Sequence, residues 1–568
     1  MADAAAQATL SDVVRQAKRW RVRPDPPQVP EGAWPALIGR LLALRGVESA
    51  AEAARFFATT AASQPVLPDI DKAVERLAQA CRSGETVAVF GDFDVDGITS
   101  AALLYENLTE LGAKPIPYLP HRESEGYGLS NAAVDSLHEL GATLLVTADC
   151  GTSSVDEIAT ARNHGMDAII LDHHSVPPLL PAALAIVNPK REPDSYAEPS
   201  AGGVSYYVLK ALRDAMNAPE NDAAMLELVA LSTVCDLAPM VEGNRALVRD
   251  GLRAIAKTQR PGLRALLDVA RIDVNSVDTE AIGFGLGPRI NAAGRMAHAR
   301  LAFDLLVSND ENEAREIAEE LDRLNRERRQ ATQDAVALAE ELVAEEQDAP
   351  LLMIGHEDLP AGIVGLVASR LVETYYRPAI VYQRGEDESR ASARSIREFD
   401  VTGALRSCAD LFVRFGGHRM AAGFTAENDK LPSIKEHLLA YAGELLAGED
   451  LTPALDIDAE LPLRELRGDE IQWLNKLAPH GIENPEPTFL SRGVLVRELR
   501  SVGKDGDHLK LRLKDGAATW PAIAFRQRGD GIAQGTLIDL VWTLTTNDYT
   551  QGGLELNVLD LRPASPSG

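Results

Sequence analysis

The feature that most constrains this chain is a series of short apolar runs that alternate with helical stretches. TVAVF (86–90), TLLVTA (143–148) and DAIIL (167–171) are rich in Val, Ile and Leu, and stretches such as SAALLYENLTELG separate them. Strands that alternate with helices predict a parallel, doubly wound α/β sheet. Ligands bind such sheets at the carboxyl ends of the strands, so the residues after each run are the first candidates for function.

Acidic and histidine residues follow these runs. They are Asp92, Asp94 and Asp96 in GDFDVDG, Asp149 in TADCG, Asp172, His173 and His174 in LDHHS, and Asp236 after the helical run MLELVALSTVC. So many carboxylates at one sheet edge would repel one another unless cations lay between them. Oxygen ligands with one or two imidazoles suit Mn²⁺ or Mg²⁺ better than structural zinc. Two such ions about 4 Å apart can promote in-line phosphoryl displacement by water.

Each motif taken alone has a simpler interpretation. GDFDVDG is also typical of a calcium-binding loop or an ordinary acidic turn, and Asp149 could cap a strand end. The tripeptide 172–174 is only suggestive by itself. All four segments in this order, at strand or helix ends, favour a two-metal centre over these separate roles.

Charge and composition divide the chain into five predicted segments. Residues 1–67 are interpreted as an N-terminal extension, and residues 68–308 as the domain with the acidic motifs. Residues 309–348 contain no Gly or Pro and are densely charged, which predicts one long connecting helix. Residues 349–450 are predicted to form a second α/β domain. Residues 451–568 contain short apolar runs between Gly, Asp and Asn, which predicts an OB-like β-barrel.

Composition limits the location and the partners of the chain. The formal net charge of −28 at pH 7 argues against bulk electrostatic coating of nucleic acid, but it allows an enzyme with a basic groove. No run approaches the ~20 apolar residues of a membrane span, and the N-terminus lacks a secretory signal, so we expect a cytoplasmic protein without membrane contact. The four cysteines include no CxxC pair, so neither disulfides nor a zinc site is expected.

Further motifs carry a family resemblance. The chain contains GDFDVDGITSAALLY, PHRESEGYGLS, TADCGTSS, LDHHSVP, STVCDLAPM, GPRINAAGRM, SARSI, FGGHRMAAGF and GIENPEPTF. In these motifs it resembles the DHH phosphoesterase superfamily, and within it the bacterial single-strand-specific exonucleases. The resemblance implies 5′-to-3′ hydrolysis of single-stranded DNA to mononucleotides in repair and recombination, with two Mn²⁺ or Mg²⁺ ions. It also implies a monomer, with a single-strand-binding protein and a helicase as candidate partners.

The resemblance implies roles for residues near the metals. The implied ligands are Asp94, Asp96, Asp149, His173 and Asp236, with Asp92 as a further candidate. Asp149 would bridge the two ions. His174 would face the substrate phosphate, and Asp172 would orient a neighbouring histidine. Arg289 in GPRINAAGRM would contact the scissile phosphate and offset its developing charge.

A second group of residues is implied to bind the strand. They are Arg122, Ser392 and Arg394 for the terminal 5′-phosphate, Gly416, Gly417 and His418 for the path of the strand, and Asn291 and Arg295 for contact with phosphate. Asn291 and Arg295 lie in a glycine-bounded segment, where backbone groups can approach phosphate closely. Simpler roles stay open: a surface position for Arg122, a solvated basic cluster for Arg394, and a core position for His418.

Several positions depart from the family's usual pattern. They are Phe93 for a common tyrosine, Ser232 and Cys235 for a more usual glycine and alanine, and Ser389, Ala391 and Glu483 near frequent glycines. We expect none of them to touch a proposed metal ligand.

Other functions fit parts of the chain. One is a DHH enzyme acting on short oligonucleotides or signalling dinucleotides, and another is a non-catalytic replication scaffold. The full-length match disfavours the first, and the complete ligand set disfavours the second. The barrel aromatics Trp520, Phe525, Trp542 and Tyr549 are candidates for base stacking, although each fits a barrel core as well.

Overall fold

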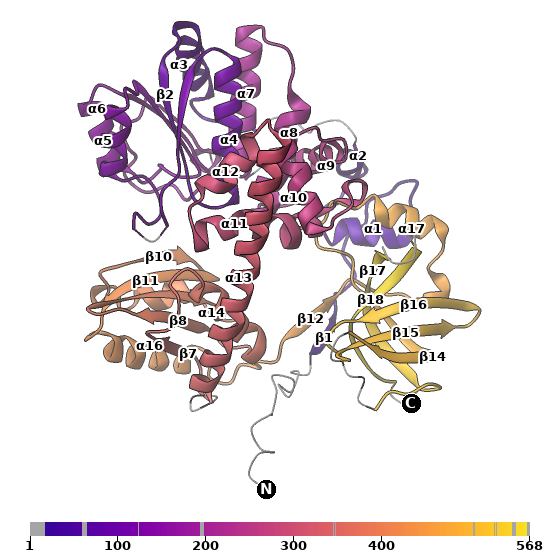
Figure 1. Cartoon of the computed structure of the whole chain (residues 1–568). Helices are drawn as coiled ribbons and strands as arrows, with labels where there is room; N and C mark the ends of the chain where they lie inside the picture. Colours follow the sequence, from indigo (N-terminus) through magenta and orange to yellow (C-terminus); the bar gives the residue numbers. More distant parts are fainter. Residues whose placement is uncertain are drawn as a thin grey trace. The chain divides into compact units, whose positions relative to one another are not determined.

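The computed structural model describes residues 18–58, 65–122, 124–192, 198–344, 346, 348–503, 506–527, 529, 531–547 and 553–564. These residues form two compact units (Figure 1). The first comprises residues 65–236 and 250–453, and the second comprises residues 18–58, 237–249 and 454–564. Each unit has hydrophobic core clusters of its own.

The acidic motifs belong to a five-stranded sheet in the first unit. Its strands are β2 (Thr86–Gly91), β3 (Lys114–Tyr118), β4 (Leu144–Ala148), β5 (Asp167–Leu171) and β6 (Ala185–Val187). They lie in the order β3-β2-β4-β5-β6, and every neighbouring pair is parallel. Strand β4 is buried along its whole length, as expected of an apolar run covered on both faces. The predicted parallel sheet is confirmed.

Helices cover both faces of this sheet. They are α3 (Ile70–Ser83), α4 (Val95–Glu110), α5 (Asn131–Glu139), α6 (Val155–Asn163) and α7 (Ala201–Met216). Helices α5 and α6 lie on one side of the sheet and α4 and α7 on the other (Figure 1). Val134 of α5 and Ile158 of α6 share a buried cluster with Phe90 of β2. The fold is therefore doubly wound, as predicted.

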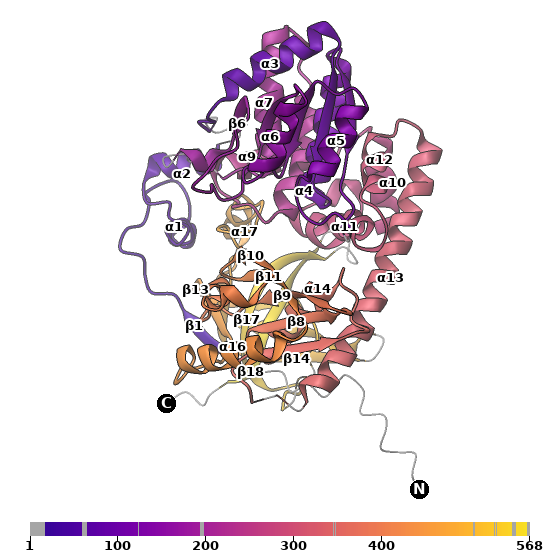
Figure 2. The same ribbon diagram turned by 90° about the vertical axis from the view of Figure 1, so that its left-hand side faces the viewer.

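The chain after the sheet is mostly helical. The elements are α8 (Asp222–Cys235), α9 (Glu242–Ile255), α10 (Pro261–Ala270), the π-helix η3 (Ala281–Leu286), α11 (Gly287–Met296) and α12 (Arg300–Val307). Helix α13 (Glu311–Val343) then confirms the predicted connecting helix and can be followed along its length in Figure 2. The carboxylate of Asp310 caps it by accepting from two backbone N–H groups.

A mixed sheet forms the second α/β part of the first unit. Its strands are β7 (Leu352–His356), β8 (Ala379–Arg384), β9 (Glu388–Arg394), β10 (Arg414–His418) and β11 (Ala421–Glu427). They lie in the order β10-β11-β9-β8-β7, with β7 and β8 parallel and the other pairs antiparallel. Helices α14 (Val364–Tyr375) and α16 (Leu431–Leu445) pack through the buried side chains Val367 and Leu438.

The second unit contains the predicted β-barrel. Its strands are β14 (Phe489–Val502), β15 (His508–Asp515), β16 (Ala518–Ala524), β17 (Leu537–Asn547) and β18 (Gly553–Pro563), and a β14–β17 pairing closes the sheet. Trp542 is fully buried, so it is not available for stacking, and Trp520 is partly buried against the barrel core. Phe525 is 54% exposed, and Tyr549 lies outside the described residues.

Part of the segment interpreted as an N-terminal extension is built into this second unit. Strand β1 (Arg19–Val22) pairs in parallel with β12 (Ala454–Ile457). Helices α1 (Ala36–Ala43) and α2 (Ala50–Phe57) follow, and Ile38 and Leu41 join the same buried cluster as Trp542. The sequence does not predict this long-range pairing. No helix among the residues placed by the structure is both long and apolar enough to cross a membrane.

Candidate active site

The candidate site lies beside strand β2, where the order of the strands in the first sheet reverses direction. Strand β2 has β3, the next strand of the chain, on one side and β4 on the other. Parallel sheets form a ligand crevice at the carboxyl ends of the strands at such a point. Asp92 follows β2, Asp149 follows β4 and Asp172 follows β5. The topology thus brings the three predicted motifs to one edge.

The loop after β2 orients its aspartates by backbone contacts. Asp94 caps α4, and its Oδ1 accepts from the backbone N–H groups of Asp96 and Gly97 at 3.0 and 3.2 Å. Asp92 is 2% exposed, and its Oδ1 has no hydrogen-bond partner among the described residues. A buried carboxylate oxygen without a partner costs free energy, so Asp92 Oδ1 is suited to a cation.

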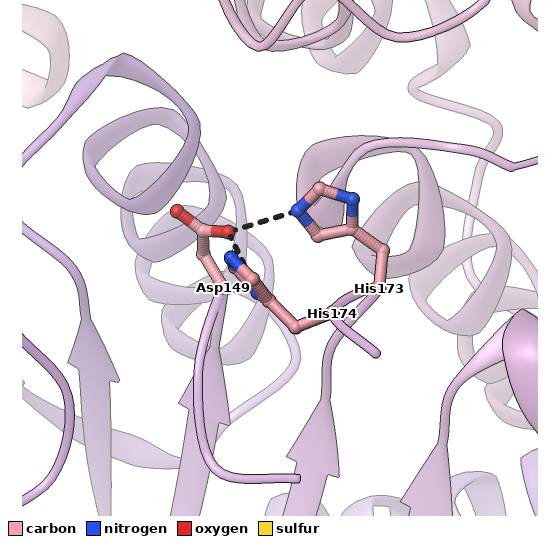
Figure 3. A group of neighbouring side chains, drawn as sticks. All are labelled: Asp149, His173 and His174. Atoms are coloured by element: carbon pink, nitrogen blue, oxygen red, sulfur yellow. Dashed lines mark hydrogen bonds and ion pairs between the residues drawn. The ribbon is translucent and has the colours of Figure 1, made fainter. Parts of the chain in front are cut away.

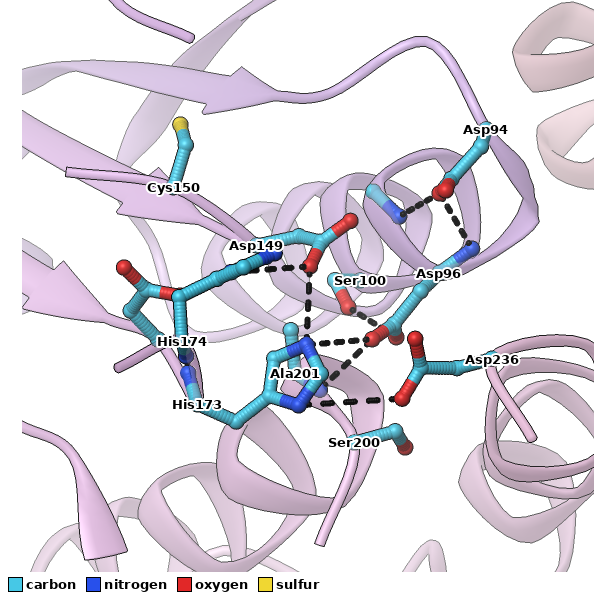
Figure 4. A network of polar contacts seen from close by, with 12 residues as sticks. Asp94, Asp96, Ser100, Asp149, Cys150, His173, His174, Ser200, Ala201 and Asp236 are labelled. Atoms are coloured by element: carbon cyan, nitrogen blue, oxygen red, sulfur yellow. Dashed lines mark hydrogen bonds and ion pairs between the residues drawn. The ribbon is translucent and has the colours of Figure 1, made fainter. Parts of the chain in front are cut away.

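Asp96 is held at the N-terminus of α7. Its oxygens accept from the backbone N–H groups of Ala201 and Gly202 at 2.8 and 2.9 Å (Figure 4). The Ser232 hydroxyl donates to Asp96 Oδ1 at 2.6 Å. Helix N-termini favour negative charge, so the start of α7 is a suitable place for a carboxylate. The expectation that the sequence departures avoid the metal ligands is therefore wrong for Ser232, because α8 places its hydroxyl against Asp96.

The two histidines surround Asp149. His173 Nε2 lies 3.1 Å from Asp149 Oδ1, and His174 Nδ1 lies 3.8 Å from the same oxygen (Figure 3). The other ring nitrogen of His173 is 3.6 Å from Asp236 Oδ2, at the end of α8. Asp149 has a φ of 65°, which turns the chain sharply after β4. Side chains from four separate segments therefore converge.

The Asp172 carboxylate contacts the main chain of both histidines and the side chain of His174. Its Oδ1 accepts from the backbone N–H groups of His173 and His174 at 2.7 and 3.1 Å and lies 2.8 Å from His174 Nδ1. Burial opposes its ionisation, but the His174 contact and a hydrogen bond from Thr152 hold the pKa of Asp172 below its ordinary value. Asp172 is thereby placed to orient His174.

Burial and neighbouring negative charges raise the pKa values of three carboxylates in the site. Burial and the charge of Asp94 raise the pKa of Asp92 well above its ordinary value. Burial and the charges of Asp96 and Asp94 raise the pKa of Asp149 in the same way. The same three causes raise the pKa of Asp236 to about 9. Bound cations would remove this repulsion, which a purely structural cluster would have to tolerate.

Three groups of ligand atoms are compact enough to hold a metal ion. They are Asp92 with Asp94 and Asp149, Asp96 with His173 and Asp236, and Asp149 with His173 and His174, each with its ligand atoms within 4.8 Å of one another. Asp149 and His173 each belong to two groups, so they can serve neighbouring ions. Carboxylate oxygens with one or two imidazoles match the ligands that Mn²⁺ and Mg²⁺ accept. The donor set therefore fits the expected ions.

The first unit also contains a pocket of about 540 Å³. Five arginines line it, and none of the described residues in its lining is acidic. The arginines are Arg122, Arg295, Arg390, Arg394 and Arg414. Burial and the charges of Arg122 and Arg328 lower the pKa of Arg295 to about 9, and burial lowers the pKa of Arg394. In a chain of net charge −28, this concentration of positive charge is suited to an anion.

The three residues expected at the 5′-end lie together in this pocket. Arg122, Ser392 and Arg394 all line it, and Arg394 Nη1 donates to Ser392 Oγ at 3.1 Å. The Arg122 guanidinium lies 4.4 Å from the centre of the Phe93 ring, so the GDFDVDG loop supports it. Arg122 and Arg394 are half-buried rather than fully solvated.

The remaining expected residues occupy varied positions. Arg295 lines the pocket and donates to the Gly362 carbonyl at 2.9 Å. Arg289 is bound to Asp322 of α13 at 3.0 Å and to the Gly285 carbonyl at 2.7 Å. Some of the expected residues do not line the pocket: Arg289, Asn291, Gly417 and His418. Gly416 does line it. His418 is exposed at the end of β10, so its core alternative does not hold.

Sequence reasoning gave no site role to three residues of this region, Tyr127, Arg390 and Arg414. Arg390 shares one face of β9 with Ser392 and Arg394, so strand alternation could have identified it. Tyr127 lies between two glycines, a usable turn signal. Arg414 carries no local signal, because only the pairing of β10 with β11 brings it near β9.

Known protein families match segments in both units of the chain. Residues 86–233 match the DHH family, N-terminal domain, and residues 338–444 match the DHHA1 domain. Residues 457–560 match the RecJ OB domain. Together with the parallel sheet and its acidic edge, these matches define a DHH phosphoesterase with an added OB domain.

The relatives identify the branch. The chain is 37% identical to the single-stranded-DNA-specific exonuclease RecJ of Salmonella typhimurium, over 92% of this chain and 95% of that protein. It is 37% identical to Escherichia coli RecJ over 86% of this chain and 89% of that protein. Bacillus subtilis RecJ is 34% identical, and the match covers 90% of this chain and 66% of that protein. The chain belongs to the RecJ family.

Solved structures show the same architecture. The crystal structure of Thermus thermophilus RecJ in complex with Mn²⁺ superposes with a TM-score of 0.82 at 29% identity, over 97% of this chain and 80% of that chain. The Mg²⁺ complex of the same protein gives a TM-score of 0.76 at 28% identity, over 97% and 79%. Both ions expected from the donor set therefore occur in a relative of this fold.

Proposed function

We propose that the chain is a metal-dependent exonuclease that hydrolyses single-stranded DNA from its 5′ end to mononucleotides, in DNA repair and recombination. The observation that carries the proposal is a carboxylate–histidine cluster linked directly to an acid-free arginine pocket. Tyr127 provides the link, because it lines the pocket and its hydroxyl contacts His174. Membership of the RecJ family supports the same reaction.

The residues of the cluster would position the scissile phosphate. Bound Mn²⁺ or Mg²⁺ ions, held by Asp92, Asp94, Asp96, Asp149, His173 and Asp236, would supply an activated water and stabilise the leaving oxygen. His174, oriented by Asp172, would donate a hydrogen bond to a phosphate oxygen. Arg289 would add positive charge as charge develops on that phosphate.

The pocket would select the end of the strand. Arg122, Ser392 and Arg394 would bind the terminal 5′-phosphate by charge-assisted hydrogen bonds. An end that must seat in a pocket before cleavage gives an exonuclease rather than an endonuclease. Asn291, Arg295 and the segment Gly416–His418 would contact the following backbone, and exposed Phe525 of the barrel is a candidate for base stacking.

The setting of the reaction follows from the same family. We expect a monomer that acts in the cytoplasm and meets single-stranded DNA together with a single-strand-binding protein and a helicase. Sedimentation of the purified chain, alone and mixed with a single-strand-binding protein, checks the monomer and the first partner.

A labelled-end digestion tests the proposed function. One 5′-phosphorylated oligonucleotide carries a label at its 5′ or its 3′ end and is digested with Mn²⁺, with Mg²⁺ and after exhaustive chelation. The 5′ label should appear at once as a mononucleotide, while the 3′ label should pass through a ladder of shortening products. Cleavage that survives chelation, or an initial 3′-mononucleotide, would contradict the proposal.

A second candidate is a phosphodiesterase for short oligonucleotides, because a closed pocket can also hold one end of a dinucleotide. A length series separates the two. The exonuclease proposal requires that strands of about 20 nucleotides or more are degraded at least as efficiently as dinucleotides. Activity confined to dinucleotides would favour the second candidate.

A further inference from the structure

Tyr127 lies between the arginine pocket and the histidines of the metal cluster. Its hydroxyl oxygen is 3.1 Å from the Asp149 carbonyl oxygen and 3.1 and 3.2 Å from the two ring nitrogens of His174. The rings of Tyr127 and His174 have their centres 5.5 Å apart. Tyr127 therefore contacts the main chain of Asp149, a predicted metal ligand. It also contacts the ring of His174, the histidine predicted to face the phosphate.

The loop that carries Tyr127 is shaped to place it there. Gly126 and Gly128 have φ values of 82° and 86°, a left-handed conformation that side chains with a Cβ seldom adopt. Glu125 braces the loop, because its carboxylate accepts from the backbone N–H of His121 and from the Tyr118 hydroxyl, both at 2.6 Å. The conformation of Tyr127 is thus set by its neighbours before any substrate binds.

The Tyr127 hydroxyl contacts the Asp149 carbonyl and the His174 ring at the same time. A carbonyl oxygen cannot donate, so the contact with Asp149 uses the single hydroxyl proton of Tyr127. The same oxygen lies within 3.2 Å of both ring nitrogens of His174, so it packs against the imidazole. Asp172 holds Nδ1 of the same imidazole at 2.8 Å from another direction. The His174 ring is therefore held between Asp172 and Tyr127.

Tyr127 lines the pocket and is more than half exposed. Four aromatic residues line the pocket, and Phe93 and Phe424 are only 8% and 4% exposed. Tyr127 is 56% exposed. Aromatic faces stack on nucleobases of any sequence, and an exposed one beside arginines suits the base or sugar of a nucleotide whose phosphate those arginines bind.

We propose that Tyr127 has two separable roles in the reaction: its hydroxyl positions His174, and its ring contacts the terminal nucleotide of the strand. Tyr127 is a positioning residue through the first role and a substrate contact through the second. The proposal rests on the proposed exonuclease function and adds a residue to its machinery.

Two substitutions separate the roles. Tyr127→Phe removes the hydroxyl and keeps the ring, so kcat should fall about tenfold, as for one lost orienting hydrogen bond, while KM stays within about twofold. Tyr127→Ala should lose kcat to the same extent and also raise KM about tenfold, as for one lost stacking contact. Tyr376→Phe, which removes a hydroxyl bonded to Glu398, is the matched control and should leave both constants unchanged.

Two further experiments test what the hydroxyl and the ring of Tyr127 each contact. In a His174→Ala background, Tyr127→Phe should have no additional effect on kcat, because the ring it positions is gone. With an oligonucleotide whose first nucleotide is abasic, Tyr127→Ala should no longer raise KM. Equal kcat for Tyr127→Phe and wild type, or additive losses with His174→Ala, would overturn the positioning role. A KM increase that persists on the abasic substrate would overturn base stacking.

These outcomes are distinct from failure of the proposed function. If wild-type protein leaves the oligonucleotide intact, the exonuclease proposal fails. If wild type digests it and all Tyr127 variants match wild type, only the inference about Tyr127 fails. Circular dichroism and melting temperatures of the variants should match those of wild type.

Discussion

At the scale of single residues, Asp149 connects several parts of the site. It belongs to two of the three compact ligand groups, and its main-chain carbonyl holds Tyr127. Its pKa is raised by burial and by the charges of Asp96 and Asp94, so it ionises readily only beside a cation. Losing this one carboxylate should therefore disable metal binding rather than folding.

Replacing Asp149 by alanine should abolish cleavage, with a loss of at least about 10³-fold in kcat. The rise in melting temperature that Mn²⁺ produces in wild type should shrink or vanish in the variant. Asp156→Ala, an exposed aspartate in the first turn of α6, is the matched control and should keep both activity and the Mn²⁺ response. An Asp149→Ala protein that cleaves at the wild-type rate would contradict the metal centre.

Arg394 offers a second test at this scale. Its guanidinium bonds Ser392 inside the pocket, where a phosphate would be desolvated and tightly held. Arg394→Ala should lower kcat/KM for 5′-phosphorylated strands about 30- to 100-fold, as for one charged hydrogen bond, and leave 5′-hydroxyl strands within about twofold. Arg397→Ala, at an exposed position shortly after β9, should change neither. Equal losses on both kinds of end would reject the phosphate role.

At the scale of secondary-structure elements, glycines let helices approach the acidic loop. A Cβ on Gly97 of α4 would lie 2.4 to 2.6 Å from backbone atoms of Asp92, and one on Gly294 of α11 would lie 2.6 Å from the Phe93 carbonyl oxygen. Backbone atoms cannot move aside as a flexible side chain can. The start of α4 and the last turn of α11 therefore fix the shape of the GDFDVDG loop.

Gly97→Ala should accordingly destabilise the protein by about 1–3 kcal/mol, the usual cost of overpacking, and should reduce activity by displacing Asp92 and Asp94. Urea denaturation monitored by circular dichroism measures the first effect. Gly443→Ala in α16 is the control, because the nearest atom that a Cβ there would meet belongs to Pro350, at 3.9 Å. That substitution should stabilise the helix by up to about 1 kcal/mol. Equal stability of the Gly97→Ala variant and wild type would refute the close-packing account.

At the scale of the whole molecule, the stability of the second unit should depend on pH through a partly buried histidine. Burial is the main reason why the pKa of His480 is lowered from 6.5 to about 4. The positive charges of Arg45 and Arg245 add to this lowering, and a backbone hydrogen bond opposes it. His480 is therefore neutral in the folded unit and protonates more readily when unfolded. The resulting stability is present above pH 6.5 and is lost as the pH falls from 6.5 to about 4.

This loss should amount to at most about 3.5 kcal/mol, at about 1.4 kcal/mol for each unit of pKa difference. Urea midpoints for the unfolding of the second unit at pH 7.5 and pH 4.5 measure it. His480→Gln removes the titrating group, so the midpoint of the variant should fall less between the two pH values than that of wild type. An equal fall in both proteins would show that other groups carry the acid sensitivity.

Sequence alone determined the local and periodic features of this protein. The apolar runs predicted the parallel sheet, because strands buried on both faces need such runs, and the Gly- and Pro-free charged stretch predicted α13. The motifs after β2, β4 and β5 predicted the ligand types, because parallel strands bring their carboxyl ends to one edge. The binding of Mn²⁺ and Mg²⁺ by a relative agrees with those ligands.

Only the tertiary structure decided which distant groups meet. The contact of Ser232 with Asp96 depends on the packing of α8 against α4, and the place of Arg414 depends on the pairing of β10 with β11. The pairing of β1 with β12 joins residues more than 400 positions apart, and the sequence of neither strand names its partner. Local propensities act over a few residues, whereas such contacts arise from packing over the whole chain, so no pattern along the sequence records them.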